Sequence, residues 1–359
     1  MRSVVRIINR KQYKGSKVSQ TARTIISVTI LTVCLGGNDF ASIAPKSECG
    51  DIEKESVLYS PGKWNAAEQH VVTVQSLRVH YIESGTGRTV VMIHGNAGSV
   101  EDFEFGVLER LSREYRVIAV DRPGHGRSDR PAGKTATVEY QAELLHRTLS
   151  HLGITQPILV GHSWGAALAL AYELKYPDEV SAMVLLAPAA YPEESGNGLL
   201  RATIRMPIVG DFSLLIGKTI MGRIMLKRNL ARAFYPQTVP DSYFKLAVTS
   251  WLGRKQLKAY LEDEWVLNDS LKKMCKRYSE IDIPVVILTG DEDRIVSPKE
   301  NAYRLHAAIP QSRLIGLKDT GHEIPQTHPE SIYAALTLIS SSSASIGFQP
   351  AKRQQYQIE

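Results

Sequence analysis

The 359-residue sequence has few cysteines, the residues that build a disulfide framework or a thiolate metal site. Its three cysteines stand at positions 34, 49 and 275, and their spacing matches no metal-ligand pattern. We expect the three scattered cysteines to be free, with a Cys49–Cys275 disulfide in an oxidising compartment as the alternative. The sequence also lacks the phosphate-loop pattern GxxxxGK(S/T) and the dinucleotide pattern GxGxxG. We therefore expect no cofactor, whether metal, nucleotide or flavin.

No acidic residue occurs in the first 23 positions, which hold seven basic ones. These seven exceed the net charge of +6 for the whole chain, so the remainder is close to neutral and offers no basic face for nucleic acid. The apolar run 25–35 follows, shorter than the roughly 20 residues of a membrane span. A basic segment before a short apolar run is typical of an export signal. We predict that residues 1–50 form a leader or anchor and linker of an exported or membrane-associated protein. A cytoplasmic location is the alternative.

Strand and helix patterns alternate through residues 60–190. The expected strands are 70–75 and 77–83, which alternate polar and apolar residues, and the continuously apolar runs 89–93, 115–121, 158–160 and 180–188. Continuous apolar runs indicate strands covered on both faces, as in a parallel sheet. Helices are expected at 101–113 and 138–152. Residues 60–190 therefore predict the first part of an α/β core.

The character of the sequence changes over residues 191–280, where helical stretches rich in Leu, Met, Lys and Arg replace the strands. We predict a helical segment here. Some of its apolar residues are candidates either for lining a hydrophobic pocket or for packing the segment onto the core: Leu214, Leu215, Ile216, Met221, Ile224 and Met225. A basic stripe indicates a solvated face, with contact to anionic lipid headgroups as the alternative: Lys218, Arg223, Lys227, Arg228 and Arg232.

The sheet pattern returns in residues 281–340. Strands are expected at 284–289 and 313–317, with a helix at 301–308 between them. The closing helix is expected to end near Leu338, because the serine run that follows offers little apolar surface. Residues 341–359 are accordingly predicted to be a disordered tail.

A serine flanked by glycines follows the apolar run 158–160, in the stretch Gly161-His162-Ser163-Trp164-Gly165. A serine at the tip of a sharp strand-to-helix turn needs glycine on both sides, because the helix and strand approach closely there. Such a turn lifts the hydroxyl clear of the sheet and leaves the Trp164 N–H free at a helix N-terminus. The pattern predicts that Ser163 is a nucleophile and that Trp164 donates to an oxyanion.

A second small-residue loop, His94-Gly95-Asn96-Ala97-Gly98, follows the apolar run 89–93. Gly95 allows close approach of the backbone to a substrate. We expect the Asn96 N–H to be the second oxyanion donor. We interpret His94 as a structural histidine that shapes the loop, since it is badly placed to reach the serine. The charged turn 121–129 is interpreted as a self-paired structural turn, with substrate binding by Arg122 or His125 as the alternative.

These three stretches, 94–98, 121–128 and 161–165, resemble in this order the motifs of the α/β-hydrolase fold superfamily. The resemblance covers about residues 70–190 and 281–340. It implies a mostly parallel, eight-stranded-type sheet with helices on both faces. It also implies that 191–280 is a helical cap inserted over the site, and that a catalytic triad follows the chain order Ser, acid, His.

The family pattern places the acid in the stretch Gly290-Asp291-Glu292-Asp293, after the strand 284–289. A glycine followed two residues later by an aspartate selects Asp293. Asp291 is the alternative, and Glu292 is expected to be solvated. His322, in the loop after the strand 313–317, stands where the family has its general base.

The resemblance therefore implies a serine hydrolase in which His322 deprotonates Ser163, Asp293 orients His322, and Asn96 and Trp164 bind the oxyanion. Aspartate stands at the nucleophile position in haloalkane dehalogenases and epoxide hydrolases, so Ser163 disfavours those activities. We expect hydrolysis of a carboxylic ester through an acyl-enzyme, with a small apolar acyl or lipid substrate. The alternatives are hydrolysis of a C–C bond or an amide, as in meta-cleavage-product hydrolases or iminopeptidases, and a catalytically idle ligand-binding protein.

Overall fold

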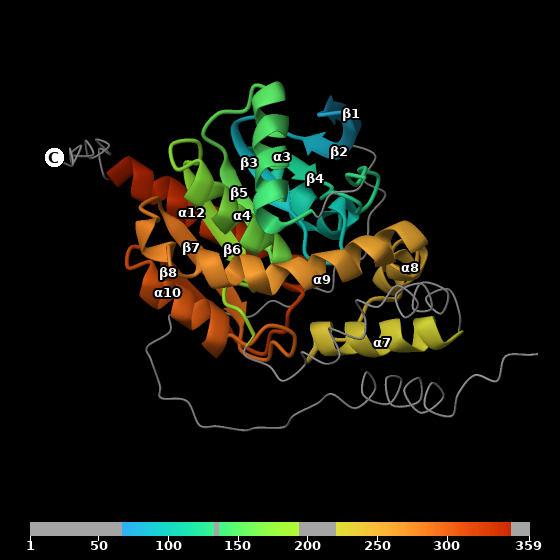
Figure 1. The fold of residues 1–359 in the computed structure, drawn as a ribbon. Coiled ribbons are helices and arrows are strands. Elements are labelled where there is room, and N and C mark those ends of the chain that lie inside the picture. Colours follow the sequence, from blue (N-terminus) through green and yellow to red (C-terminus); the bar gives the residue numbers. More distant parts are fainter. Residues whose placement is uncertain (1–66, 133–135, 194–219, 346–359) are drawn as a thin grey trace, which may run out of the picture.

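A computed structural model describes residues 67–132, 136–193 and 220–345 (Figure 1). An eight-stranded sheet runs through the molecule in the order β1-β2-β4-β3-β5-β6-β7-β8. The strands are β1 (Glu68–Val74), β2 (Leu77–Ser84), β3 (Arg88–Ile93), β4 (Tyr115–Val120), β5 (Ile158–His162), β6 (Ala182–Leu186), β7 (Val285–Gly290) and β8 (Arg313–Leu317). The six strands from β4 to β8 in the sheet are parallel, and β1 and β2 add an antiparallel edge. The predicted α/β class is confirmed.

The continuously apolar strands are buried on both faces. In β5, Leu159 belongs to one hydrophobic cluster, whereas Ile158 and Val160 belong to the other. Successive side chains of a strand point to opposite faces, so a strand covered on both sides has no polar positions to alternate with. For this reason the parallel strands could be predicted from the sequence.

Helices cover both faces of the sheet (Figure 1). The helical segments of the core are η1 (Val100–Phe103), α2 (Val107–Leu111), α3 (Val138–His151), α4 (Trp164–Lys175), η2 (Tyr278–Glu280), η3 (Lys299–Tyr303, a π-helical turn), α10 (Arg304–Ala308), α11 (Ile324–Thr327) and α12 (Pro329–Ser345). Buried side chains of α3, α4 and α10 pack in one cluster, and those of η1, α2 and α12 in the other. The sheet therefore lies between two helical layers.

Three further helices lie between β6 and β7 in the chain, where a helical cap was expected. They are α7 (Ile220–Phe234), α8 (Asp241–Ser250) and α9 (Arg254–Met274). In Figure 1, α9 crosses below α3 and α4, and α7 lies farther from the sheet. α9 packs against both α3 and α4. We call α7, α8 and α9 the helical insertion.

The helical insertion has a small hydrophobic core of its own. Its buried members are Phe105 from the sheet domain and Leu226, Leu230, Phe234, Tyr243 and Ala247 from α7 and α8. Of the apolar residues singled out from the sequence, Ile224 is 48% exposed and Met225 is half-buried. The Met221 side chain and Leu214, Leu215 and Ile216 lie outside the described residues. Neither Ile224 nor Met225 is a buried member of this cluster.

The basic stripe of α7 is on the surface. Arg223, Lys227, Arg228 and Arg232 are all exposed, and Lys218 lies outside the described residues. Arg232 donates a hydrogen bond to the carbonyl of Arg294 at 3.0 Å. The described residues of the stripe are therefore exposed, as both interpretations require, and Arg232 is hydrogen-bonded to the loop after β7.

The closing helix α12 is longer than predicted. It continues to Ser345 instead of ending near Leu338. Ile339 is buried on the sheet, and the Ser340 hydroxyl donates to the carbonyl of Leu336 at 3.0 Å. Serines in a helix satisfy their hydroxyls on the preceding turn, so the polar run does not stop the helix.

The predicted leader 1–50 and the tail beyond Ser345 lie outside the described residues. Among the helices of the described ranges, none combines the length and apolar character needed to cross a bilayer.

We predict that Gly161→Ala destabilises the protein by about 3 kcal/mol, because a methyl group there would lie 2.5 Å from the carbonyl oxygen of Gly165 and 2.7 Å from the Ala166 Cα. Gly153→Ala is the control: Gly153 has φ +66° with nothing within 4 Å, so only backbone strain of about 1 kcal/mol is expected. Urea unfolding measures both. Equal losses would contradict the close packing of β5 on α4.

Candidate active site

Ser163 occupies a strained turn between β5 and α4. Its backbone has φ 52° and ψ −114°, a conformation that costs a non-glycine residue on the order of 1–3 kcal/mol. The end of β6 and the loop after it hold this turn: the Ser163 N–H donates to the Leu186 carbonyl at 2.9 Å, and the Ser163 carbonyl accepts from the Ala189 N–H at 3.2 Å. The strain persists because these hydrogen bonds fix the turn, which presents Ser163 at the carboxyl end of the sheet.

The flanking glycines are needed for the close packing around this turn. A methyl group on Gly165 would collide with the carbonyl oxygens of Ile93 and His94. One on Gly95 would lie 3.3 Å from the Cβ of Ser163. The serine turn and the loop after β3 are therefore in close contact at Gly95. Asn96 is the next residue of that loop.

Asp293 and His322 are brought together by the loops after β7 and β8. The Nδ1–H of His322 donates to Asp293 Oδ2 at 2.7 Å. The other oxygen of Asp293 accepts from the N–H groups of Ile295 and Val296, at 2.7 and 2.9 Å. These donors fix the carboxylate so that one oxygen faces the imidazole.

The competing carboxylates have other positions. Asp291 accepts from the Thr320 N–H at 3.1 Å and so joins the two loops instead of contacting His322. Glu292 is exposed, as expected. The geometry therefore agrees with the choice of Asp293 over Asp291.

The loop that carries His322 is anchored to the helical insertion and to the serine turn. The His322 N–H donates to the carbonyl of Ala233, near the end of α7, at 2.8 Å. Its own carbonyl accepts from His162 Nε2 at 3.0 Å, and the rings of these two histidines are 4.9 Å apart. Because His162 immediately precedes Ser163, this contact places the His322 loop beside the serine. Burial, and then the neighbouring His322, lower the pKa of His162 to about 3, so its ring stays neutral.

The protonation of His322 is set by opposing effects. Burial lowers its pKa, but the charge and hydrogen bond of Asp293, together with the charge of Glu323, outweigh burial and raise it above the usual value. The pair therefore favours the imidazolium that forms when a histidine accepts a proton.

The two expected oxyanion donors lie on either side of the serine turn. Asn96 is held by its side chain, whose amide donates to Glu264 Oε1 at 2.7 Å and whose oxygen accepts from the Ala97 N–H at 3.1 Å. Trp164 begins α4 and is almost completely buried. The Asn96 side chain is therefore hydrogen-bonded to α9, and Trp164 is packed at the start of α4.

His94 is fully buried and shapes the loop, as expected. Its Nδ1–H donates to the carbonyl of Gly95 at 2.8 Å, and its Nε2 accepts from the Arg122 N–H at 2.9 Å. Burial, with the nearby Arg122 charge, lowers its pKa, so His94 is neutral with the proton on Nδ1. It has no nitrogen left for Ser163.

The charged turn 121–129 is structural, but the prediction that it pairs with itself is wrong for its central residues. Arg122 Nη1 and His125 Nε2 both donate to Oδ2 of Asp263 in α9, at 2.7 and 2.9 Å. Asp121 pairs both inside and outside the turn: it accepts from the Arg127 N–H at 2.9 Å, and it also binds His80 at 2.7 Å and the Val100 N–H at 2.9 Å. Because Arg122 is 2% exposed and fully engaged, it is not a substrate ligand.

Sequence reasoning missed Asp263 because it lies far along the chain from its partners. A signal was present in the helical spacing of three residues that are all buried in α9: Gln256, Ala259 and Asp263. A carboxylate on the buried stripe of a helix must find cationic partners.

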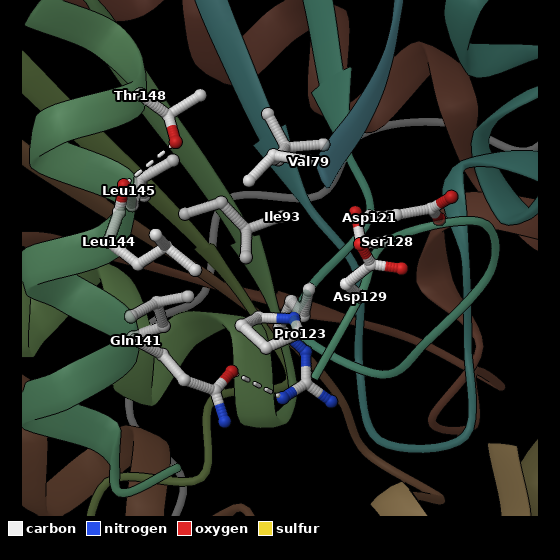
Figure 2. Close-up of a pocket in the computed structure, with 13 residues that line it drawn as sticks. Val79, Ile93, Asp121, Pro123, Ser128, Asp129, Gln141, Leu144, Leu145 and Thr148 are labelled. Carbon is white, nitrogen blue, oxygen red and sulfur yellow. Dashed lines mark hydrogen bonds between the residues drawn. The ribbon is translucent and has the colours of Figure 1, made fainter. Parts of the chain in front are cut away.

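A small cavity lies behind this turn (Figure 2). It is lined by Val79, Ile93, Pro123, Gln141 and Leu144, among others, and its water-accessible volume of about 20 Å³ is room for a single water. The lining contains neither Ser163 nor His322, so this space is separate from the candidate catalytic residues.

In the described ranges, no group of three or more His, Cys, Asp or Glu side chains is arranged to hold a metal ion.

Two buried carboxyls beside the site also escaped the sequence analysis. Burial raises the pKa of Glu323 to about 7, with the His322 charge opposing and the Asp293 charge reinforcing the effect. Asp102 is likewise shifted well above its usual pKa by burial and by the Glu323 charge. The Tyr243 hydroxyl of α8 donates to Asp102 Oδ1 at 3.1 Å.

The raised pKa of Glu323 predicts that stability falls as pH rises from about 4.5 to about 7. In that window the folded protein binds the proton and the unfolded chain does not, so the free energy of unfolding drops by up to about 3 kcal/mol. Glu323→Gln should flatten this decline in urea unfolding at pH 5 and pH 8. The exposed Glu292→Gln variant should keep the wild-type slope. An unchanged slope in Glu323→Gln would show that Glu323 is not the titrating group.

Comparison with known proteins identifies the family. The model of the alpha/beta hydrolase fold matches residues 88–329. The chain belongs to this family.

Its relatives have several activities. An uncharacterized hydrolase of Bacillus subtilis, YugF, is 30% identical over 72% of this chain and 93% of its own length. Lipase 1 of Psychrobacter immobilis is 25% identical over 78% of this chain and 86% of its own. A 2-hydroxy-6-oxononadienedioate/2-hydroxy-6-oxononatrienedioate hydrolase of Burkholderia vietnamiensis is 28% identical over 74% and 93%.

A solved structure from Acinetobacter baumannii AYE, described as that of a putative lipase (lip1), matches 79% of this chain and 93% of its own chain, with a TM-score of 0.64 and 20% sequence identity. This likeness shows the fold alone. Together the comparisons show a hydrolase and leave its bond specificity to be argued from the site.

Proposed function

We propose that this protein hydrolyses a carboxylic ester through an acyl-enzyme on Ser163. The observation that carries the proposal is the buried Asp293–His322 hydrogen bond of 2.7 Å, formed beside the strained turn of Ser163. A serine hydroxyl is a weak nucleophile until a base takes its proton, and a histidine oriented by a carboxylate is such a base.

His322 takes the proton of Ser163 as the hydroxyl attacks the ester carbonyl. Asp293 stabilises the resulting imidazolium through the Nδ1 hydrogen bond. The N–H groups of Asn96 and Trp164 receive the oxyanion, a role in which one donor is worth about 10²- to 10³-fold in rate. The imidazolium then protonates the departing alcohol, and a water molecule activated by His322 releases the acid.

An ester is favoured over the carbon–carbon bond of a dienedioate. Lipase 1 of Psychrobacter immobilis supports ester hydrolysis, and the relative of Burkholderia vietnamiensis supports the alternative. A dicarboxylate needs cationic ligands, and Arg122, the cation beside the Asn96 loop, is neutralised by Asp263. A neutral acyl substrate needs no cationic ligand. The neutralisation of Arg122 therefore supports an ester of apolar chains as the substrate.

Turnover of p-nitrophenyl esters from acetyl to palmitoyl tests the proposal. Wild-type protein should hydrolyse them, with Ser163→Ala and His322→Ala lowering kcat by about 10³-fold or more. Gly153→Ala, distant from the site, serves as the handling control. Folded wild-type protein that cleaves no ester but cleaves a 2-hydroxy-6-oxo dienedioate would move the assignment to the carbon–carbon bond.

Asp293→Asn should change both the rate and its pH dependence. Because the Asp293 charge raises the pKa of His322, its removal should shift the acid limb of kcat/KM to lower pH. The plateau should fall by about 10²- to 10⁴-fold, since His322 loses its orienting partner. Asp291→Asn, which alters a carboxylate bound to Thr320, should leave the acid limb in place. The reverse result for the two variants would reassign the acid to Asp291.

A further inference from the structure

Asp263 is the most heavily bonded carboxylate in the helical insertion. It is fully buried in α9. Its Oδ2 accepts from Arg122 and His125, and its Oδ1 accepts from Arg130 at 2.9 Å and from Gln141 at 3.1 Å. All four partners belong to the sheet domain, so this one side chain joins the helical insertion to the core.

Arg122 carries this connection to the loop of the first oxyanion donor. Its Nη2 donates to the Gly95 carbonyl at 3.0 Å, and its Nε donates to the His94 carbonyl at 3.2 Å. The Gly95 carbonyl and the Asn96 N–H belong to the same planar, trans peptide unit. Fixing the direction of that carbonyl therefore fixes the opposite direction of the Asn96 N–H.

The same two residues hold the second donor. The guanidinium of Arg122 stacks 4.0 Å above the indole ring of Trp164, and the indole N–H donates to the backbone carbonyl of Asp263 at 3.4 Å. Trp164 is thereby clamped at the start of α4. The Arg122–Asp263 ion pair therefore contacts the peptide unit of one proposed donor and the side chain of the other.

Gln256, two turns earlier in α9, acts on the same loop. Its side chain donates to the carbonyls of Ala97 and Gly98 at 2.7 and 2.8 Å, and accepts from the Gly126 N–H at 2.8 Å. The buried face of α9 thus contacts the loop after β3 through Gln256, at the carbonyls of Ala97 and Gly98.

We propose that Asp263 is a positioning residue, which aims the N–H groups of Asn96 and Trp164 through Arg122 and so couples the helical insertion to the oxyanion site. Removing its charge leaves the Arg122 guanidinium buried without its anion, and a buried unpaired charge is relieved by movement of its side chain. That movement removes the Arg122 hydrogen bond to the Gly95 carbonyl, which keeps only the one from His94, and it removes the guanidinium from the face of the Trp164 indole. This role rests on the proposed function, because it matters for rate only if an oxyanion forms there.

The test compares Asp263→Asn with Glu262→Gln. Glu262 is the matched control, since it precedes Asp263 in α9 and binds Arg130 at 2.6 Å, on the side of the network away from Asn96. Asp263→Asn should lower kcat for p-nitrophenyl esters by about 10- to 100-fold with KM within about threefold. Glu262→Gln should stay within about twofold in both. Equal effects, or a loss of thermal stability with kcat unchanged, would overturn the proposal.

Hydrogen exchange at the backbone amides of residues 94–98 supplies a readout that needs no substrate. Asp263→Asn should speed exchange there, and Glu262→Gln should not. If Ser163→Ala retained full turnover, the proposed function would fail while this measurement still decided the positioning role. Should Asp263→Asn not fold, Arg122→Lys replaces it, because lysine keeps the charge but loses the forked contacts to His94 and Gly95. Wild-type exchange in the folded variant would overturn the proposal.

Discussion

The close backbone packing around Ser163 is the constraint on which the rest of the site depends. Gly161 and Gly165 leave no room for side chains between β5, α4 and the end of β3. The turn can then hold Ser163 at φ 52°, since the hydrogen bond to Leu186 offsets the strain. The same contact brings the Asn96 loop against the serine. The proposed nucleophile and the proposed oxyanion donors thus lie around one site of close backbone packing.

The second organising feature is that buried polar groups, more than apolar contacts, join the helical insertion to the sheet domain near the site. Asp263 of α9 binds Arg122, the carbonyl of Ala233 at the end of α7 holds His322, and Tyr243 of α8 binds Asp102. Directional bonds of this kind fix geometry at the atoms they join, which hydrophobic contact does not. The proposed reaction depends on sub-ångström placement of the oxyanion donors, and directional hydrogen bonds can hold them to that precision.

The sequence predicted the structure where the packing requirement of one residue restricts which residue types can stand next to it. The apolar runs predicted the parallel strands because burial on both faces excludes polar residues, and the glycines around Ser163 predicted the turn. Asp293 and His322 required a family resemblance, because spacing alone leaves Asp291 open. The partners of Asp263 were not predictable, since they lie in segments far from it in the chain. The length of α12 was underestimated because its serine hydroxyls can bond to carbonyls of the preceding turn, which lets the helix continue. The predicted leader and tail fall outside the described residues.

The most direct test of the central claim is covalent labelling with a serine-directed fluorophosphonate, followed by mass spectrometry of the digested protein. We predict one adduct, on the peptide that carries Ser163, with labelling slowed strongly in His322→Ala because the base is missing. An idle ligand-binding protein would stay unlabelled under conditions in which its fold is intact. Absence of label on folded protein, or label on a different serine, would contradict the assignment of Ser163 as the nucleophile.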